Sequence, residues 1–204
     1  MCGDAAGSRP PVAIDIPIGL PETVRYRRCD EQARELLGGR RDSVFPPPAR
    51  YMLEAAGDYT AIRELVAAEK KRNPAARGYS AQAAGITTKV REVDAWVCAH
   101  PESEAWLFEC HPELSFYALN DGGALPSKHS AAGLVQRLGR IRELFPDAEA
   151  QLADGPWSGK QAAPADFLDA YGALGTALVC ARHDQEELGD GERDVRGVLM
   201  RMAM

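Results

Sequence analysis

Three short apolar runs in the chain have the pattern of β-strands. They cover residues 12–16 (VAIDI), 105–111 (AWLFECH) and 197–203. Alternate side chains of an extended strand share a face, so Glu109 and His111 are expected to point to one side and Cys110 to the other. Pro112 has no N–H to give to a sheet and should end the second strand. The polar end of this strand is therefore the first candidate for a functional site.

Most of the remaining chain has the spacing of three to four residues between apolar positions that is typical of amphipathic helices. We expect helices over residues 30–37, 50–57, 60–72, 80–99, 127–145 and 164–183, a loop over 147–160, and a disordered N-terminus over 1–11. This order of elements predicts a single α/β domain over residues 12–204, with an all-helical insertion at about residues 50–100.

The composition is ordinary for a globular protein and adds three constraints. Of the 204 residues, 45% are apolar and 26% are charged, with a net charge of −6. A basic surface over the whole molecule is absent, so a nucleic acid would have to bind a local patch or bind through metal ions. The five cysteines lack metal-ligand spacing and are odd in number, which indicates reduced thiols. With no long apolar run and no signal-peptide pattern, we expect a cytoplasmic protein without a membrane partner.

Acidic residues interrupt the apolar elements in a pattern that suits a divalent cation. Asp15 lies near the end of the first strand, Glu109 near the end of the second, and Asp169 early in a largely apolar helix. A carboxylate in an apolar element is costly to bury unless it is paired or holds a metal ion. We expect these three to be the ligands of Mg²⁺ or Mn²⁺, with His111 and Glu113 completing the catalytic group. Such ions can activate water for phosphodiester cleavage.

Each of these side chains also has a structural interpretation that the sequence leaves open. Asp15 would accept backbone hydrogen bonds in the PIGLP turn that follows it. Glu109 and Glu113 would be hydrated where the strand meets solvent. His111 would either donate a proton to a leaving oxygen or lock the turn at Pro112 by hydrogen bonding.

Basic residues gather in two places along the chain. Guanidinium groups match the geometry of phosphate oxygens, so both groups are predicted to bind substrate. The alternative is a solvated surface, which is the usual role of a charge run. The residues concerned are Arg25, Arg27, Arg28, Arg40 and Arg41 after the first strand, and Lys128 and Arg137 in the segment 127–145.

Several longer motifs resemble a known family. They are IDIPIGLP (14–21), RRCDEQARELLGGRRDSVFPPPAR (27–50), FECHPELSF (108–116) and DFLDAYGAL (166–174). They are similar to motifs of a bacterial and archaeal family, the domain of unknown function 429 family, which is described as predicted nucleases with an RNase H-like fold. The resemblance implies a mixed sheet flanked by helices, with acids near one end of the sheet. In it, Asp15 matches the IDIP motif, Asp169 the LDA helix, and Glu109, His111 and Glu113 the E-x-HPE motif.

The strand count departs from the fold that this resemblance implies. An RNase H-like domain usually opens with three strands, the first of which carries an essential Asp, whereas this chain opens at the IDIP strand. We therefore expect either an N-terminally shortened form without those strands or a degenerate member of the family. In both cases a metal ligand would be missing, and a second copy would cover the exposed sheet edge in a homodimer.

Two functions from different classes follow from these observations. The first is a divalent-metal-dependent nuclease of RNase H-like type, weakly active or inactive in this short form. The second is a non-catalytic RNase H-like module that binds nucleic acid or a protein partner.

Overall fold

A computed structural model describes residues 9–155 and 163–204 of the chain. The described part is a mixed α/β structure in which most of the regular structure is helical. In chain order its elements are β1 (Val12–Ile14), α1 (Arg28–Leu37), η1 (Gly38–Ser43), η2 (Arg50–Ala55), α2 (Tyr59–Arg72), α3 (Ala81–Gly85), α4 (Thr87–Ala99), η3 (Pro101–Ala105), β2 (Leu107–Glu109), α5 (Pro112–Leu119), α6 (Ala131–Leu144), α7 (Ala148–Asp154), α8 (Pro164–Ala181), β3 (Glu187–Leu188) and β4 (Met202–Ala203), where η denotes a 3₁₀ helix.

The strands β1 and β2 run parallel at the centre of the molecule. Ile14 lies opposite Glu109, and the N–H of Cys110 donates to the carbonyl of Ile14 (2.9 Å). Because the strands are parallel and in this register, their carboxyl ends lie side by side. Asp15 and Glu109 therefore leave the sheet at the same end.

The described strands form two separate sheets of two strands each, and not the single mixed sheet that the resemblance implies. β1 ends at Ile14, and the chain bends at Asp15 and Ile16 before Pro17. Of the predicted strand 197–203, Met202–Ala203 pairs antiparallel to β3, and Leu199 forms an isolated antiparallel bridge with Arg193. Residues 193–199 instead form a tight turn, in which Asp194 Oδ1 accepts from the N–H groups of Arg196 (2.8 Å) and Val198 (3.0 Å).

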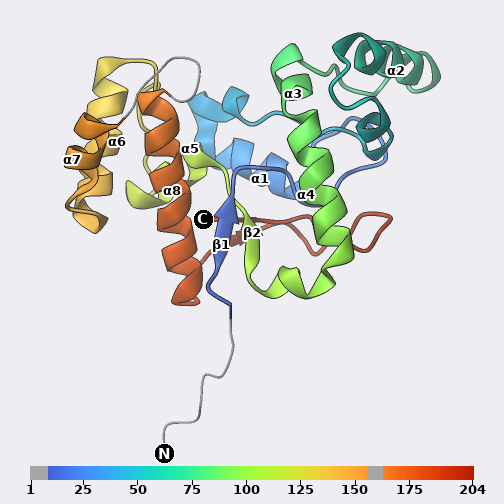
Figure 1. Ribbon diagram of the computed structural model, residues 1–204. Helices are drawn as coiled ribbons and strands as arrows, with labels where there is room; N and C mark the ends of the chain where they lie inside the picture. Colours follow the sequence, from blue (N-terminus) through green and yellow to red (C-terminus); the bar gives the residue numbers. More distant parts are fainter. Residues whose placement is uncertain (1–8, 156–162) are drawn as a thin grey trace, which may run out of the picture.

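Helices cover both sides of the central strands. Figure 1 shows α8, α6 and α7 on one side of β1 and β2, and α4, α3 and α2 on the other. The helix α8 packs against β1, α5 and α6. Its buried Leu168 joins a core with Phe116 of α5 and Ile141 of α6, and its Cys180 packs with Phe108 of β2. These contacts fix the position of α8, and hence of Asp169, relative to the end of β1.

Most predicted helices are present, with shifted ends. The predicted helix 80–99 is two helices, α3 and α4, which separate at Gly85–Ile86. The predicted helix 127–145 starts later, at Ala131, because Ser130 Oγ caps it by accepting from the N–H of Gly133 (3.1 Å).

Three other segments differ from the predictions or lie outside the described residues. Residues 50–55 form a 3₁₀ helix, and the predicted loop 147–160 contains the helix α7. Residues 1–8 of the predicted disordered N-terminus, and 156–160 of the predicted loop, are not described. No helix in 9–155 or 163–204 has the length and apolar character needed to cross a membrane.

The loop 126–128 lies directly on α6 at Gly133. A Cβ atom at Gly133 would lie 2.0 Å from the carbonyl oxygen of Ser127 and 2.8 Å from that of Pro126. Arg137, one turn further along α6, donates to the same Pro126 carbonyl (2.7 Å). The absence of a side chain at Gly133 thus allows the loop that carries Lys128 to lie against the helix.

We predict that Gly133→Ala lowers the free energy of unfolding by about 3 kcal/mol, because the new methyl group meets backbone atoms that are held in place. Gly139→Ala on the same helix is the matched control, since a Cβ atom at Gly139 would have no atom within 4 Å. That change should raise the free energy of unfolding by about 0.5–1 kcal/mol. Urea unfolding of the three proteins measures both values. Equal effects of the two substitutions would contradict this packing.

Candidate functional site

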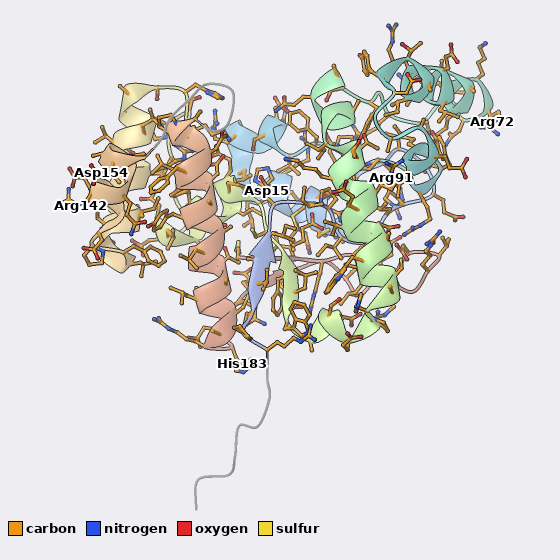
Figure 2. All side chains as sticks on the ribbon, viewed as in Figure 1. Asp15, Arg72, Arg91, Arg142, Asp154 and His183 are labelled. Carbon is orange, nitrogen blue, oxygen red and sulfur yellow. The ribbon has the colours of Figure 1, made fainter. Side chains whose placement is uncertain are left out.

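A cavity of about 490 Å³ opens at the carboxyl end of β1 and β2. We call it the acidic cleft. Figure 2 shows Asp15 at the tip of β1, and Asp15 is one of the residues that line the cleft. The lining residues that matter below are Asp15, Arg27, Asp30, Arg40, Asp42, Phe45, Glu109, His111, Glu113, Lys128 and His129. The cleft thus contains most of the predicted catalytic residues but only three of the seven predicted substrate-binding residues.

Asp15 has an exposed side chain, and its carboxylate takes part in no hydrogen bond or ion pair among the described residues. Its pKa is raised, first because surrounding protein displaces water from the carboxylate and also because Asp169 repels its charge. His111 and Lys128 act in the opposite direction. Asp169, His111 and Lys128 are therefore close enough to Asp15 to influence its ionisation.

Asp169 is placed beside this group by α8, but it does not line the acidic cleft itself. Its Oδ2 accepts a hydrogen bond from the ammonium group of Lys128, which does line the cleft. The pair is partly buried. One carboxylate oxygen of Asp169 remains outside this ion pair.

Glu109 is held in a buried cluster with Arg27 and Asp30. Arg27 is only 1% exposed, and its two terminal nitrogens donate to Glu109 Oε1 (2.6 Å) and Oε2 (2.8 Å). The same guanidinium donates to Asp30 from Nε (3.0 Å) and Nη2 (2.7 Å). The N–H of Ile18 also donates to Glu109 Oε2 (2.6 Å). Both oxygens of Glu109 are thus occupied by internal donors.

The charge of this cluster is unbalanced, because one guanidinium serves two carboxylates. Burial raises the pKa of Glu109 to about 7, and the charge of Asp30 acts in the same direction, while Arg27 opposes the shift. Glu109 therefore favours its protonated form more strongly than a carboxyl group in water does.

Glu113 and His111 line the acidic cleft and connect α5 to η1 and α6. Glu113 accepts from the buried Arg137 (2.8 Å) and from Arg40 (3.2 Å). His111 caps α5, because its Nδ1 accepts from the N–H of Glu113 (3.2 Å). The other ring nitrogen, Nε2, then carries the hydrogen and donates to the carbonyl of Ser43 (3.2 Å). His111 thus ties the end of η1 to the start of α5.

The predicted substrate-binding residues have different environments. Arg27 and Arg137 are fully buried in the ion pairs described above. Arg25 pairs with Glu192, Arg28 with Glu31, and Arg41 lies 3.9 Å from Asp42, all outside the lining of the cleft or at the surface. Arg40 and Lys128 are the two that line the cleft and remain partly exposed.

Sequence reasoning missed the acids that bind these arginines. Asp30 binds Arg27 three residues earlier, a spacing at which side chains meet in the first turn of a helix, and this was the one local signal. A second cluster has no such signal. In it, Arg50 binds Asp94 (2.8 Å) and Asp194, whose Oδ2 also accepts from the N–H of Leu20 (3.0 Å).

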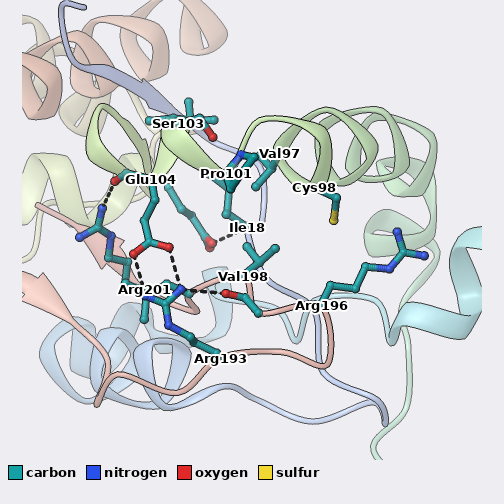
Figure 3. Close-up of a pocket in the computed structure, with 14 residues that line it drawn as sticks. Ile18, Val97, Cys98, Pro101, Ser103, Glu104, Arg193, Arg196, Val198 and Arg201 are labelled. Carbon is teal, nitrogen blue, oxygen red and sulfur yellow. Dashed lines mark hydrogen bonds and ion pairs between the residues drawn. The ribbon is translucent and has the colours of Figure 1, made fainter. Parts of the chain in front are cut away.

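A second, smaller cavity of about 160 Å³, which Glu109 also lines, lies between α4, η3 and the turn 193–199. Figure 3 shows Arg193 bound through both terminal nitrogens to Glu104 at its edge, both at 2.7 Å. This cavity is lined by neither Asp15 nor His111. Of the predicted catalytic residues, Asp15, His111 and Glu113 line the acidic cleft alone, Glu109 lines both cavities, and Asp169 lines neither.

Among the described residues, no group of three or more His, Cys, Asp or Glu side chains is arranged to hold a metal ion. The geometry separates the three predicted ligands: Asp15 is free, Asp169 is half free, and Glu109 is occupied by Arg27. Mg²⁺ often keeps several waters and uses only one or two carboxylates. Asp15 and Asp169 each have a carboxylate oxygen outside the ion pairs of the described residues, whereas both oxygens of Glu109 accept from Arg27. Metal binding itself stays a prediction.

We predict that the stabilising effect of Glu109 decreases as pH rises from about 4.5 to 7. Between the ordinary pKa of a glutamate and the raised value of about 7, the folded protein binds a proton that the unfolded chain releases. Stability falls with rising pH in such a window. The free energy of unfolding of the wild type minus that of Glu109→Gln, measured across this range, should therefore fall. A difference that rises with pH would show that Arg27 outweighs the effect of burial.

Comparison with known proteins assigns the chain to a family. A family model described as "Protein of unknown function (DUF429)" matches residues 3–192. No curated protein and no solved structure gives a significant match to the chain. Since the matched range covers nearly the whole sequence, this chain belongs to the DUF429 family of proteins of unknown function.

Proposed function

We propose that the chain is a divalent-metal-dependent nuclease of RNase H-like type, with Asp15 as its principal metal ligand. The observation that carries the proposal is the contrast between Asp15 and the other predicted acids. Asp15 faces the acidic cleft without a hydrogen bond or ion pair from any described residue, whereas Glu109, Glu113 and Asp169 each bind Arg or Lys. An unpaired carboxylate with a raised pKa in a concave site is a candidate functional group.

The arrangement of the elements supports the same proposal. The acids lie at the ends of two parallel strands and on a late helix that packs against the first strand. This is the placement of acids that the resemblance to RNase H-like nucleases implies. The resemblance is an analogy of fold, so the activity rests on the site.

Asp15 and Asp169 would hold the ion, with water molecules filling its remaining positions. When bound, Mg²⁺ or Mn²⁺ would polarise the phosphodiester and activate a water molecule for attack. Lys128 balances the charge of Asp169 and lies where it would meet a substrate phosphate.

Glu109 acts on the site through Arg27, as a positioning residue. Arg27 donates to the carbonyls of Ile18 (2.9 Å) and Gly19 (3.2 Å), in the turn that directly follows the strand of Asp15. The pair of Glu109 and Arg27 thus fixes the direction in which the chain leaves Asp15. In this scheme the E-x-HPE motif supports the metal ligand and does not replace it.

The second candidate function is a non-catalytic module that binds nucleic acid or a protein partner. It is favoured by the same pairing that occupies Glu109 and Glu113, because a site with one free carboxylate has few fixed ligands for an ion.

We predict metal-dependent cleavage that Asp15→Asn reduces by at least about 100-fold, since loss of a principal metal ligand removes the group that activates the water. The assay uses labelled single-stranded RNA, duplex DNA, an RNA–DNA hybrid and a four-way junction, with Mn²⁺ or Mg²⁺ and with EDTA. Asp42→Asn is the matched control, because Asp42 is an exposed acid that lines the same cleft. It should keep the activity.

An equal loss of cleavage in Asp15→Asn and Asp42→Asn would show that Asp15 is not the principal metal ligand. Cleavage that persists unchanged in Asp15→Asn would likewise contradict the role of Asp15 as the principal metal ligand. If the folded wild type cleaves none of these substrates, the nuclease proposal fails and the binding module takes its place.

A further inference from the structure

One part of the acidic cleft is apolar and serves no purpose in holding a metal ion. It consists of the segment 44–48 (VFPPP) and residues of the region around α3, including Tyr79 and Ile86. Phe45 is 40% exposed and Ile86 is 36% exposed, although both are large apolar residues. An exposed phenylalanine beside carboxylates in a cavity has the properties of a surface that stacks on a ligand ring.

Phe45 is held in place from both sides along the chain. Before it, the carbonyl of Ser43 accepts from His111, and Val44 is buried in the core with Leu114. After it, three consecutive prolines restrict the backbone, because each fixes its own φ angle. The ring is thus presented on a stiff segment that is tied to the end of β2. A stiff segment loses little conformational freedom when a ligand binds, which favours affinity.

The size of the cleft limits what can reach Asp15. A cavity of about 490 Å³ lies within the range of volumes in which proteins bind small molecules. A single nucleotide unit has the size of the small molecules that such cavities bind.

The cleft also presents donors for phosphate groups. Lys128, His129 and Arg40 line it, and Lys128 and Arg40 are both partly exposed. An aromatic ring next to cationic side chains is the combination that binds unpaired nucleic acid, because every base offers a face for stacking.

We propose that the acidic cleft takes unpaired, single-stranded nucleic acid, with Phe45 stacking on the base next to the phosphate at Asp15. The proposal rests on the proposed nuclease function for the position of that phosphate. This proposal adds the class of substrate, which the carboxylates of the proposed metal site do not define by themselves.

Binding of fluorescent 12-mers tests the proposal, measured by anisotropy in Ca²⁺ so that the result does not depend on cleavage. Single-stranded RNA or DNA should bind at least about tenfold more tightly than a duplex of the same sequence. Phe45→Ala should weaken single-strand binding about tenfold, as expected for the loss of one stacked base, and should leave duplex binding unchanged. Phe45→Trp should retain binding. Tyr59→Ala is the matched control, because Tyr59 is 45% exposed but lies outside the cleft.

Equal affinity for single strands and duplexes, no effect of Phe45→Ala, or no binding of any nucleic acid would overturn the proposal. The results also separate it from the nuclease function. Metal-dependent cleavage that is lost in Asp15→Asn but insensitive to Phe45→Ala would leave the nuclease standing without this substrate class. Single-strand binding that depends on Phe45, without any cleavage, would keep this inference and reject the nuclease.

Discussion

One arginine, Arg27, is enclosed by the protein and binds groups from three separate parts of the chain. Its guanidinium holds Asp30 at the start of α1, Glu109 at the end of β2, and the carbonyls of Ile18 and Gly19. Breaking a buried pair of this kind costs about 3–5 kcal/mol, because a charge is then left without a partner. The turn after β1, the start of α1 and the end of β2 are thus joined at one point.

This constraint decides which acids remain available for chemistry. Arg27 occupies Glu109, and Arg137 with Arg40 occupies Glu113, so the acids of the E-x-HPE motif hold the cleft together. Asp15 extends from β1 beyond the reach of these arginines, into the cleft. The chain therefore separates the groups that build the site from the group proposed to act in it.

Features of the fold and of the acidic cleft are predictable from the sequence when they depend on residues close together in the chain. They are not predictable when they depend on residues far apart. The apolar runs predicted the positions of β1 and β2 and the polar side chains at their ends, because strand patterns are local. The partner of Glu109 is 82 residues away, and no periodicity indicates it. Arg27 and Arg137 look like phosphate-binding residues in the sequence, and only the packing around them shows that they are internal. The break between α3 and α4 also had no clear sign in the sequence, since a single glycine such as Gly85 is tolerated inside a helical pattern.

The central claim is that Asp15, and not Glu109, is the ligand that the acidic cleft offers to a divalent cation. Anomalous diffraction from crystals soaked in Mn²⁺ tests it most directly. The account predicts a peak within coordination distance of Asp15, on the side of Asp169, with Arg27 still bound to Glu109. A peak on Glu109 with Arg27 displaced, or manganese bound elsewhere with none at Asp15, would contradict it.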